Sequence, residues 1–412
     1  MSNFYNAPFL LPVGMEDILP NDAAYENIIT EKMMQHFASF GYQRVKPPLA
    51  EYAEGLFAGR NIAERSFRVM DPTSHKLLAI RPDITIQVAR IATSRLKDTP
   101  RPLRLCYMGQ VLWVEGSQLQ PQRQFGQLGI ELIGVRDARA DVELVQIAAE
   151  SLKKIGIDDI SIDITCPPLA GELIKDIEFT EQERQLLFEA FNEKDAAQIS
   201  TFKDKLGSKA EELLALLTSI GNAKYAYKAL TSFEHKGEAK RHVEEIGIII
   251  DNLSQKIPNT QITLDPIENR GFNYYSGVSF SIYDKKTGTT VARGGRYRLA
   301  QNNEPASGLS FYTHNLLKAA HRPKLPKRIY LPASESEALA QDYRAKGWVT
   351  VRGFNSDTNI EAEAIQLNCD YYSHKGILQE IGYDENETVK ARNEFNEDVI
   401  DASKKGRPIF NG

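Results

Sequence analysis

The first periodic pattern in the chain is that of a helix. After Pro20, large apolar side chains recur at intervals of three and four residues, a spacing that places them on one face of a helix. They are Tyr25, Ile28, Ile29, Met33, Phe37 and Phe40. Asn21 or Asp22 is a candidate N-terminal cap, and Gly41 ends the pattern. The pattern predicts a helix packed on a core, followed by a strand that the prolines of KPPLAEY interrupt.

A period of two follows at residues 123–131. Successive residues of a strand point to opposite faces, so every second side chain shares a face. Those sharing one face here are Arg123, Phe125, Gln127, Gly129 and Glu131. The preceding stretch RLCYMGQVLWVEG is typical of an antiparallel partner strand, joined through the loop GSQLQPQ. This pairing predicts a pocket floor with an amide and a carboxylate beside a glycine, and it allows Trp113 to lie on the same face.

Strand-like and helix-like stretches divide the chain into five parts. Residues 1–170 show strand signals separated by turns, which favour an α+β fold with an antiparallel sheet flanked by helices. Residues 171–258 are rich in Glu, Lys, Leu and Ala and predict a helical insertion, after which the sheet resumes over 259–320. A linker leads to a small C-terminal α/β domain with a βαβαβ pattern at 328–381. Residues 382–412 form a polar tail that is either helical or disordered.

Composition and charge narrow the class of protein. The chain has 412 residues, of which 42% are hydrophobic and 25% charged, enough for a buried core in two or three domains. The formal net charge of -5 gives no general attraction to nucleic acid. The three cysteines have no CxxC spacing, so we expect neither a disulfide framework nor a metal site. The sequence also shows no leader pattern and no bilayer-length apolar run, so we expect no membrane association and a cytoplasmic location.

Four segments far apart in sequence carry the polar groups that a free amino acid needs. They contribute Asp83 and Thr85 (RPDIT), Gln127 and Glu131 (the strand above), Arg270, Tyr274 and Tyr275 (RGFNYY), and Arg293, Arg296 and Tyr297 (ARGGRY). An ammonium group needs anionic or amide oxygens, and a carboxylate needs a cation, for which arginine is well suited. An imidazole needs an acceptor for one ring nitrogen and a hydroxyl for the other. Glu131 with Tyr274 or Tyr275 can supply both.

The order of these motifs resembles the catalytic core of histidyl-tRNA synthetase and its paralogues. The motifs are PVGMEDILP, FGYQRVKPPLAEY, RPDIT, RQFGQLGIELIG, RGFNYY and GGRY, and they cover roughly residues 9–317. Each motif is weak alone, but six in this order indicate class II aminoacyl-tRNA synthetase ancestry. The resemblance implies histidine contacts at Asp83, Thr85, Gln127, Glu131, Arg270 and Tyr275. The family carries glutamate at the position of Asp83, so the side chain here is one methylene shorter.

The same resemblance implies that the ATP-binding positions have lost their charge. Trp113 stands where the family has the motif 2 arginine that holds the α-phosphate of ATP. GLSFYTHNLLKA aligns with the family's GFAMGLERL, so Asn315 replaces a second ATP-binding arginine. The loop EGSQLQPQR also lacks the basic residues of the family's ERPQKGRYR. Because charge stabilisation at the phosphate is usually a large catalytic contribution, we expect no adenylation.

A chain that keeps the family's histidine contacts but lacks its ATP contacts resembles the regulatory subunits of ATP phosphoribosyltransferase. Members of this paralogous family partner the short-form catalytic subunit in the first step of histidine biosynthesis. The C-terminal domain is about half the length of a full anticodon-binding domain, so we do not expect tRNA as a ligand, and the chain has no DDxxxTG loop of a transferase. We therefore expect a non-catalytic regulatory subunit without a cofactor, with histidine as effector, that forms a homodimer within a hetero-oligomer.

Alternatives remain at the level of function and of single residues. The chain is alternatively a histidyl-tRNA synthetase with atypical ATP contacts, or an orphan paralogue that binds another amino acid or RNA. Glu131 is alternatively a carboxylate neutralised by Arg123 or Arg270. Arg270 and Arg293 are alternatively surface residues, Tyr274 and Tyr275 core aromatics, and Trp113 a residue that fills a void.

Overall fold

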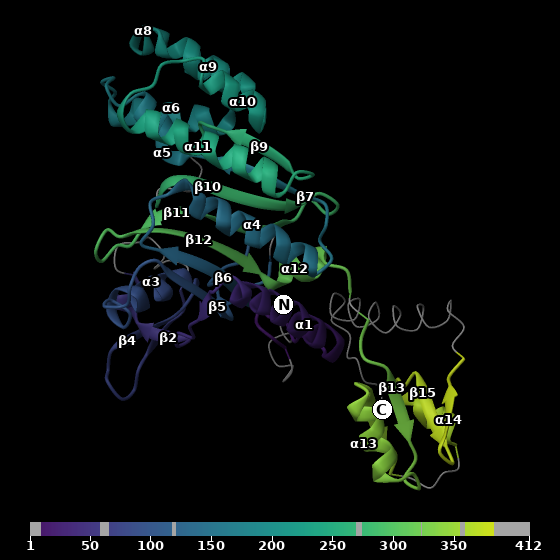
Figure 1. Cartoon of the computed structure of the whole chain (residues 1–412). Coiled ribbons are helices and arrows are strands. Elements are labelled where there is room, and N and C mark those ends of the chain that lie inside the picture. The colour runs from purple at the N-terminus through teal and green to yellow at the C-terminus, as the bar shows by residue number, and fades with distance from the viewer. Residues whose placement is uncertain are drawn as a thin grey trace, which may run out of the picture. The chain divides into compact units, whose positions relative to one another are not determined.

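The structure is a computed structural model, and it describes residues 10–57, 66–117, 121–268, 274–322, 324–354 and 359–382. The chain divides into two units, Met1–Arg322 and Pro323–Gly412. The first unit contains a nine-stranded and a three-stranded sheet, and the second contains a four-stranded sheet (Figure 1). Arg270 and the expected polar tail beyond Gly382 lie outside the described residues.

A nine-stranded sheet forms the centre of the first unit. Its strand order is β1-β5-β6-β12-β11-β10-β7-β9-β8, and neighbours are antiparallel except for the pairs β1/β5 and β7/β9. The strands are β1 (Gln43–Arg44), β5 (Leu103–Leu112), β6 (Gln124–Ile133), β7 (Ile160–Thr165), β8 (Gly221–Asn222), β9 (Gln261–Asp265), β10 (Tyr275–Asp284), β11 (Thr290–Arg298) and β12 (Pro305–Tyr312). The expected α+β class, with a mainly antiparallel sheet flanked by helices, is confirmed.

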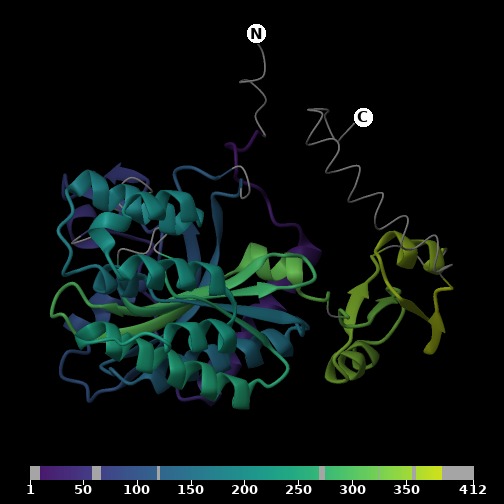
Figure 2. The same cartoon turned by 90° about the horizontal axis from the view of Figure 1, so that it is seen from above.

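The two faces of this sheet are covered by different helices. One face carries the even-numbered side chains of β6, such as Leu128 and Ile130, and packs against the core-facing residues of α1, α4, α11 and α12. The other face carries Tyr107, Phe125 and Tyr297 and packs against α3. The helices are α1 (Pro20–Ser39), α3 (Thr85–Ser94), α4 (Ala138–Lys154), α11 (Gly237–Lys256) and α12 (Thr313–Ala319). Figure 2 shows the same layers from above. The odd-numbered residues of β6 therefore face α3.

Helix α1 starts earlier than the cap candidates suggested. Leu19 is the N-cap residue, Pro20 opens the helix, and no side chain caps it, so the prediction of Asn21 or Asp22 as the cap is wrong. Proline suits the first helical position because its φ is already helical and its missing N–H has no partner there. The predicted apolar face holds, with Ile29, Met33 and Phe37 buried.

The stretch 171–258, expected as a helical insertion, is mainly helical and adds one short strand. Its helices, together with α5 before it, gather beside the β7–β9 end of the sheet (Figure 1). They are α5 (Pro167–Leu173), α6 (Glu181–Glu193), α7 (Ala196–Thr201), α8 (Lys203–Leu206), α9 (Lys209–Ser219), α10 (Ala223–Leu230) and α11. Thr180 and Glu183 form a capping box that starts α6. The strand β8 pairs with β9 at the sheet edge.

The first unit also contains a small antiparallel sheet that precedes α3 in the chain. It has the order β2-β4-β3, with β2 (Ala50–Tyr52), β3 (Arg68–Met70) and β4 (Leu77–Ile80), and the short helix α2 (Ala53–Phe57) follows β2. The segment RPDIT connects β4 to α3. In it, the buried guanidinium of Arg81 donates to the carbonyl oxygens of Pro47 (3.0 Å) and Gln110 (2.8 Å). Arg81 therefore ties the proline loop after β1 to β5.

The second unit has the expected βαβαβ order and one further strand. It contains β13 (Arg328–Leu331), α13 (Glu337–Ala345), β14 (Val349–Arg352), α14 (Ile360–Gln366), β15 (Tyr371–His374) and β16 (Ile377–Glu380). The sequence pattern missed β16, which pairs antiparallel with β15. Lys375 and Gly376 have φ values of 52° and 76°, as a tight two-residue hairpin turn requires. All four residues of β16 are exposed, so the strand lacks the alternation that identifies a strand by sequence.

Candidate functional site

The predicted pocket floor is formed by the antiparallel pair β5 and β6, with β12 and β11 beside them. Leu105 lies opposite Glu131, and Tyr107 lies opposite Gly129, so their side chains share the face toward α3. The predicted hairpin is confirmed. A Cβ atom at Gly129 would lie 2.4 Å from the Tyr107 hydroxyl, and one at Gly308 would lie 1.8 Å from Glu131 Oε2. The two glycines are therefore required by these polar groups.

One end of this face holds an amide fixed between a backbone donor and a carboxylate. Gln127 is fully buried; its Oε1 accepts from Ile84 N at 2.8 Å, and its Nε2 donates to Asp83 Oδ2 at 3.0 Å. The second oxygen of Asp83 accepts from Thr85 N at 2.7 Å. The structure therefore brings together Asp83, Thr85 and Gln127, three of the predicted histidine contacts, from the start of α3 and from β6.

Tyr107 and Ser310 join the same group, and the sequence reasoning did not single out either. The Tyr107 hydroxyl lies 2.7 Å from Ser310 Oγ and 3.0 Å from Thr85 Oγ1, and Gln127 Nε2 also donates to Ser310 Oγ at 3.1 Å. The signal for Tyr107 was its place in the strand facing Gly129. The signal for Ser310 was its place in GLSFYTHNLLKA, where the similar motif GFAMGLERL has alanine.

The other end of the face is built around Glu131. This side chain is fully buried, and it accepts hydrogen bonds from Tyr297 at 2.8 Å and from Tyr107 at 3.4 Å. Burial, together with the negative charges of Asp83 and Glu131, raises the pKa of Tyr275 to about 12. Burial and Glu131 likewise hold the pKa of Tyr107 well above its usual value. Both phenols are therefore neutral hydroxyls near pH 7.

The two tyrosines of RGFNYY lie with their rings side by side. Their ring centroids are 4.2 Å apart, and the Tyr274 ring is also 6.2 Å from that of Tyr297. Successive residues of a strand would point to opposite faces, but Tyr274 precedes β10 and only Tyr275 lies in it. Tyr274 is 44% exposed, which excludes a role as a buried core residue. Tyr275 is the better placed of the two to meet a ligand beside Glu131.

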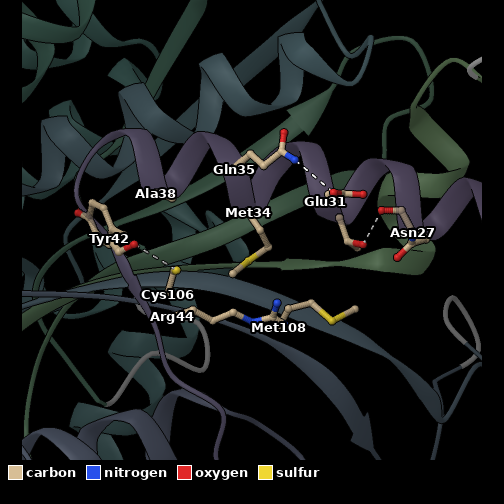
Figure 3. Close-up of a pocket in the computed structure, with 10 residues that line it drawn as sticks. Asn27, Glu31, Met34, Gln35, Ala38, Tyr42, Arg44, Cys106 and Met108 are labelled. Atoms are coloured by element: carbon tan, nitrogen blue, oxygen red, sulfur yellow. Dashed lines mark hydrogen bonds between the residues drawn. The ribbon is translucent and has the colours of Figure 1, made fainter. Parts of the chain in front are cut away.

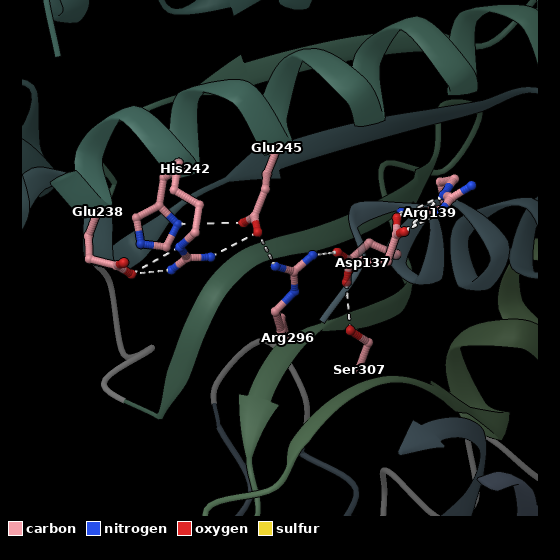
Figure 4. A network of polar contacts seen from close by, with 9 residues as sticks. Asp137, Arg139, Glu238, His242, Glu245, Arg296 and Ser307 are labelled. Atoms are coloured by element: carbon pink, nitrogen blue, oxygen red, sulfur yellow. Dashed lines mark hydrogen bonds and ion pairs between the residues drawn. The ribbon is translucent and has the colours of Figure 1, made fainter. Parts of the chain in front are cut away.

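Of the three arginines that the sequence grouped together, the two in the described structure do not lie together. Arg270 lies outside the described residues, and Arg293 is exposed on β11. Arg296 was grouped with the ligand-binding residues, and that prediction is wrong, because alternation along β11 turns it to the opposite face of the sheet. There it is buried between Asp141 of α4 and Glu245 of α11, with its Nη1 atom 2.7 Å from Glu245 Oε1 (Figure 4).

This Arg296 cluster fastens the insertion to the sheet. Ser307 donates to Asp141 Oδ1 at 2.7 Å, and Arg241 donates to Glu245 Oε1 at 2.8 Å. Burial alone would raise the pKa of Glu245, but His242, Arg296 and Arg241 together lower it to about 2. The Glu245 carboxylate is therefore charged at neutral pH.

The two positions assigned to lost ATP contacts hold neutral side chains engaged with the protein itself. The indole N–H of Trp113 donates to Pro82 O at 2.9 Å, and its ring meets that of Phe125 edge-on at 4.9 Å. Asn315 donates through its amide to Thr290 O at 2.9 Å. Trp113 packs with the residues of the pocket face, as the alternation allowed. Neither side chain presents a cation to a phosphate.

Aromatic rings occupy the space around Trp113. Phe125 is in edge contact with Tyr312 at 5.5 Å and with His314 at 4.6 Å, and Trp113 reaches Tyr312 at 6.4 Å. Burial, with a smaller effect of Lys318, lowers the pKa of His314 to about 4, so the imidazole is neutral near pH 7. The guanidinium of Arg123 donates to the backbone oxygens of Trp113 and Val13. His314 therefore does not replace the missing positive charge.

A surface hollow of about 500 Å³ lies away from the predicted pocket, between α1 and the β1–β5 edge of the sheet (Figure 3). Its lining includes Met34 and Gln35 of α1, Tyr42 after it, and Cys106 and Met108 of β5. The β5 residues are even-numbered and so lie on the face opposite to Tyr107. This hollow is thus separate from the group around Gln127 and Glu131.

In the part of the chain that the structure describes, no group of three or more His, Cys, Asp or Glu side chains is arranged to hold a metal ion. Within the same residues, no helix is both long and apolar enough to cross a membrane.

Comparisons with known proteins identify the family. Residues 14–316 match a family model described as histidyl-tRNA synthetase. An ATP phosphoribosyltransferase regulatory subunit from Rhodospirillum centenum is 39% identical over 375 residues, which are 90% of this chain and 96% of the relative. A similar protein of the same name from Paramagnetospirillum magneticum is 40% identical over 87% of this chain and 94% of its own length.

Solved structures agree with this assignment. A Bacillus halodurans protein described as an ATP phosphoribosyltransferase regulatory subunit/histidyl-tRNA synthetase superposes with a TM-score of 0.76 at 25% identity, covering 90% of this chain and 98% of that one. The predicted resemblance and the class II synthetase-like fold are both confirmed. The chain belongs to the family of ATP phosphoribosyltransferase regulatory subunits, which share the fold of histidyl-tRNA synthetase.

Proposed function

We propose that this chain is a non-catalytic subunit of ATP phosphoribosyltransferase, acting in the first step of histidine biosynthesis, and that it binds histidine between Gln127 and Glu131 as a feedback signal. One observation carries the proposal. The amino-acid end keeps a fully hydrogen-bonded polar group, whereas the positions that correspond to the family's ATP-phosphate contacts hold Trp113 and Asn315.

The Gln127 end suits a ligand ammonium group. The backbone N–H of Ile84 requires an acceptor, which fixes Oε1 of Gln127 toward it, and the Asp83 carboxylate requires a donor, which fixes Nε2. Both N–H bonds of the amide are then used, by Asp83 and by Ser310. The ligand meets the remaining capacity of carbonyl, carboxylate and Thr85 hydroxyl oxygens. A cationic group fits such a set and a ligand carboxylate does not.

The Glu131 end suits an imidazole. A carboxyl oxygen accepts a hydrogen bond from one ring nitrogen, and a neutral tyrosine hydroxyl serves the other. Tyr275, whose pKa is raised to about 12, is such a hydroxyl and lies where Glu131 and Asp83 both influence it. Arg270 is assigned to the ligand carboxylate by the family resemblance. Glu131 is more than a carboxylate neutralised by an arginine, because it is buried between tyrosine hydroxyls.

The assembly is proposed from the family and from the surface of α1. A protein described as an ATP phosphoribosyl transferase (HisG:HisZ) complex from Thermotoga maritima shares the fold, with a TM-score of 0.56 at 19% identity over 70% of this chain and 97% of that one. We assign a short-form catalytic transferase as the partner, in the cytoplasm. The hollow beside α1 contains Tyr42 and Arg44 of the FGYQRVKPPLAEY motif, through which class II cores pair. We propose a homodimer contact there, within a larger hetero-oligomer.

The experiment is a histidine titration of the complex reconstituted with a short-form transferase, following ATP phosphoribosylation. Wild-type chain should activate the transferase, and histidine should inhibit the complex. Arg270→Ala should activate normally but respond less to histidine, since a ligand shifts an equilibrium only by its differential affinity for the two states. Failure of a folded, assembled Arg270→Ala chain to activate would show that the pocket belongs to the activation surface. Absence of histidine binding by the wild type would refute the pocket.

A further inference from the structure

We propose that Ser310 is a positioning residue that links the two ends of the histidine pocket. Its hydroxyl holds Gln127 in the orientation that accepts an ammonium group and connects this amide, through Tyr107, to Glu131. The proposal rests on the proposed function, and it concerns how the site selects a ligand that carries both an α-ammonium group and an imidazole.

The first step is the position of Ser310 between two groups. It lies on β12 opposite Gly129 of β6, so its side chain shares the pocket face with Gln127 and Tyr107. Its Oγ atom is 3.1 Å from Gln127 Nε2 and 2.7 Å from the Tyr107 hydroxyl. Gln127 Nε2 can only donate, so Ser310 accepts from it and has its own proton for Tyr107.

The second step is the direction of the chain of hydrogen bonds. If Ser310 donates to Tyr107, the Tyr107 proton is available for Glu131, whose Oε1 lies 3.4 Å away. The series Gln127 to Ser310 to Tyr107 to Glu131 then has one donor and one acceptor at every contact. Tyr107 is fully buried and neutral, so it acts only through its hydroxyl. Buried hydrogen-bond networks of this kind strengthen one another, so that each end depends on the other.

The third step is that this sequence differs from the similar synthetase motifs at two residues, and both residues contact the same atom, Gln127 Nε2. Asp83 replaces a glutamate, and Ser310 stands where GFAMGLERL has alanine. Both accept a hydrogen bond from Gln127 Nε2. With the shorter acid in place, Ser310 provides the amide with its second acceptor. Removal of its hydroxyl would leave a buried N–H without that partner, which such sites do not tolerate without cost.

The test compares two ligands on three variants by calorimetry, using the full chain. The ligands are histidine and 3-(imidazol-4-yl)propionate, which lacks the ammonium group. Ser310→Ala should weaken histidine about 3- to 10-fold and the propionate by a smaller factor, because the direct defect is at the Gln127 end and only the coupling through Tyr107 reaches the Glu131 end. Ser307→Ala is the matched control, since Ser307 is a buried serine on the same strand that faces Asp141 on the opposite side. It should leave both affinities unchanged.

Tyr107→Phe tests the link itself. It should weaken histidine, and the double variant with Ser310→Ala should lose less than the product of the two single losses, because both changes break one chain. Equal losses for the two ligands, independent effects of the two substitutions, or wild-type affinity in Ser310→Ala would each overturn the role of Ser310. If wild-type chain does not bind histidine, the proposed function fails and this inference fails with it. If wild-type chain binds histidine but any of those outcomes is found, only the role of Ser310 fails.

Discussion

The face of the sheet that packs under α3 has two regions with opposite chemistry. In the polar region, Gln127, Asp83 and Glu131 are each fixed by hydrogen bonds of defined direction. In the aromatic region, Trp113 and Phe125 meet Tyr312 and His314 through ring contacts. Both regions are built on the same strands, β5, β6 and β12. The same scaffold therefore carries a hydrogen-bonded polar group at one end and packed aromatic rings at the other.

The difference shows why one region can change without the other. A ring contact can form in offset-stacked or edge-to-face geometry and contributes about 0.5–1.5 kcal/mol beyond area burial, so several residue types can fill the aromatic region. A buried amide or carboxyl group without its partner is costly, so the polar region retains its set. Under the proposed function, loss of adenylation requires substitutions only at the positions that correspond to the family's phosphate contacts. In this region Gly129 and Gly308 make room for Tyr107 and Glu131.

The largest expected effect concerns adenylation. Purified chain should show histidine-dependent ATP–pyrophosphate exchange at least about 10⁴-fold below that of a histidyl-tRNA synthetase assayed in parallel, since each lost phosphate contact costs about 10²–10³-fold. The paired substitution Trp113→Arg with Asn315→Arg should not restore it, because the connecting loop also lacks basic residues. Robust exchange by the wild type would show that the aromatic region still supports ATP chemistry, and it would favour the synthetase alternative.

The next effect concerns the polar region. Glu131→Gln keeps the volume of the side chain but replaces a carboxyl acceptor of the imidazole, and it should weaken histidine binding about 10- to 100-fold in calorimetry. Glu304→Gln is the matched control, because Glu304 accepts from Arg101 outside the pocket. Unchanged affinity in Glu131→Gln would place the ligand elsewhere.

The sequence predicted the strand pairing and the polar residues well because both follow from local pattern. Alternation over 123–131 gives the common face of Gln127 and Glu131, and Gly129 marks the space that Tyr107 occupies. The same alternation should have excluded Arg296 once Tyr297 was assigned to the pocket. That error came from reading a motif as a unit when successive strand residues face opposite ways.

Other features depend on contacts between distant segments. Ser310 gains its role only when β12 pairs with β6 and places it beside Gln127, and nothing within its own stretch indicates that neighbour. Arg296 finds its partners on α4 and α11, which only the folded chain brings together. The wrong prediction of a side-chain cap on α1 was a local error, because Pro20 itself marks the start of the helix.

A smaller effect concerns pH and the aromatic region. Burial lowers the pKa of His314 to about 4, below the unfolded value near 6.5, so the unfolded chain binds more protons between these values. Stability of the first unit should therefore fall as pH drops from 7 to 5, with about 1–2 kcal/mol due to His314. Urea unfolding of His314→Phe, which retains a ring, should show a shallower pH dependence.

The smallest effect separates packing from binding at Trp113. Trp113→Phe keeps a ring against Phe125 but removes the indole N–H that donates to Pro82 O, so the free energy of unfolding should fall by about 1 kcal/mol. Pro82 adjoins Asp83, so a role of Trp113 in ligand recognition would reach the pocket through this contact. We expect unchanged histidine affinity in calorimetry, because Asp83 is held independently by Thr85 N and Gln127 Nε2. A loss of affinity larger than about threefold, without a matching loss of stability, would show that the aromatic region still takes part in binding the ligand.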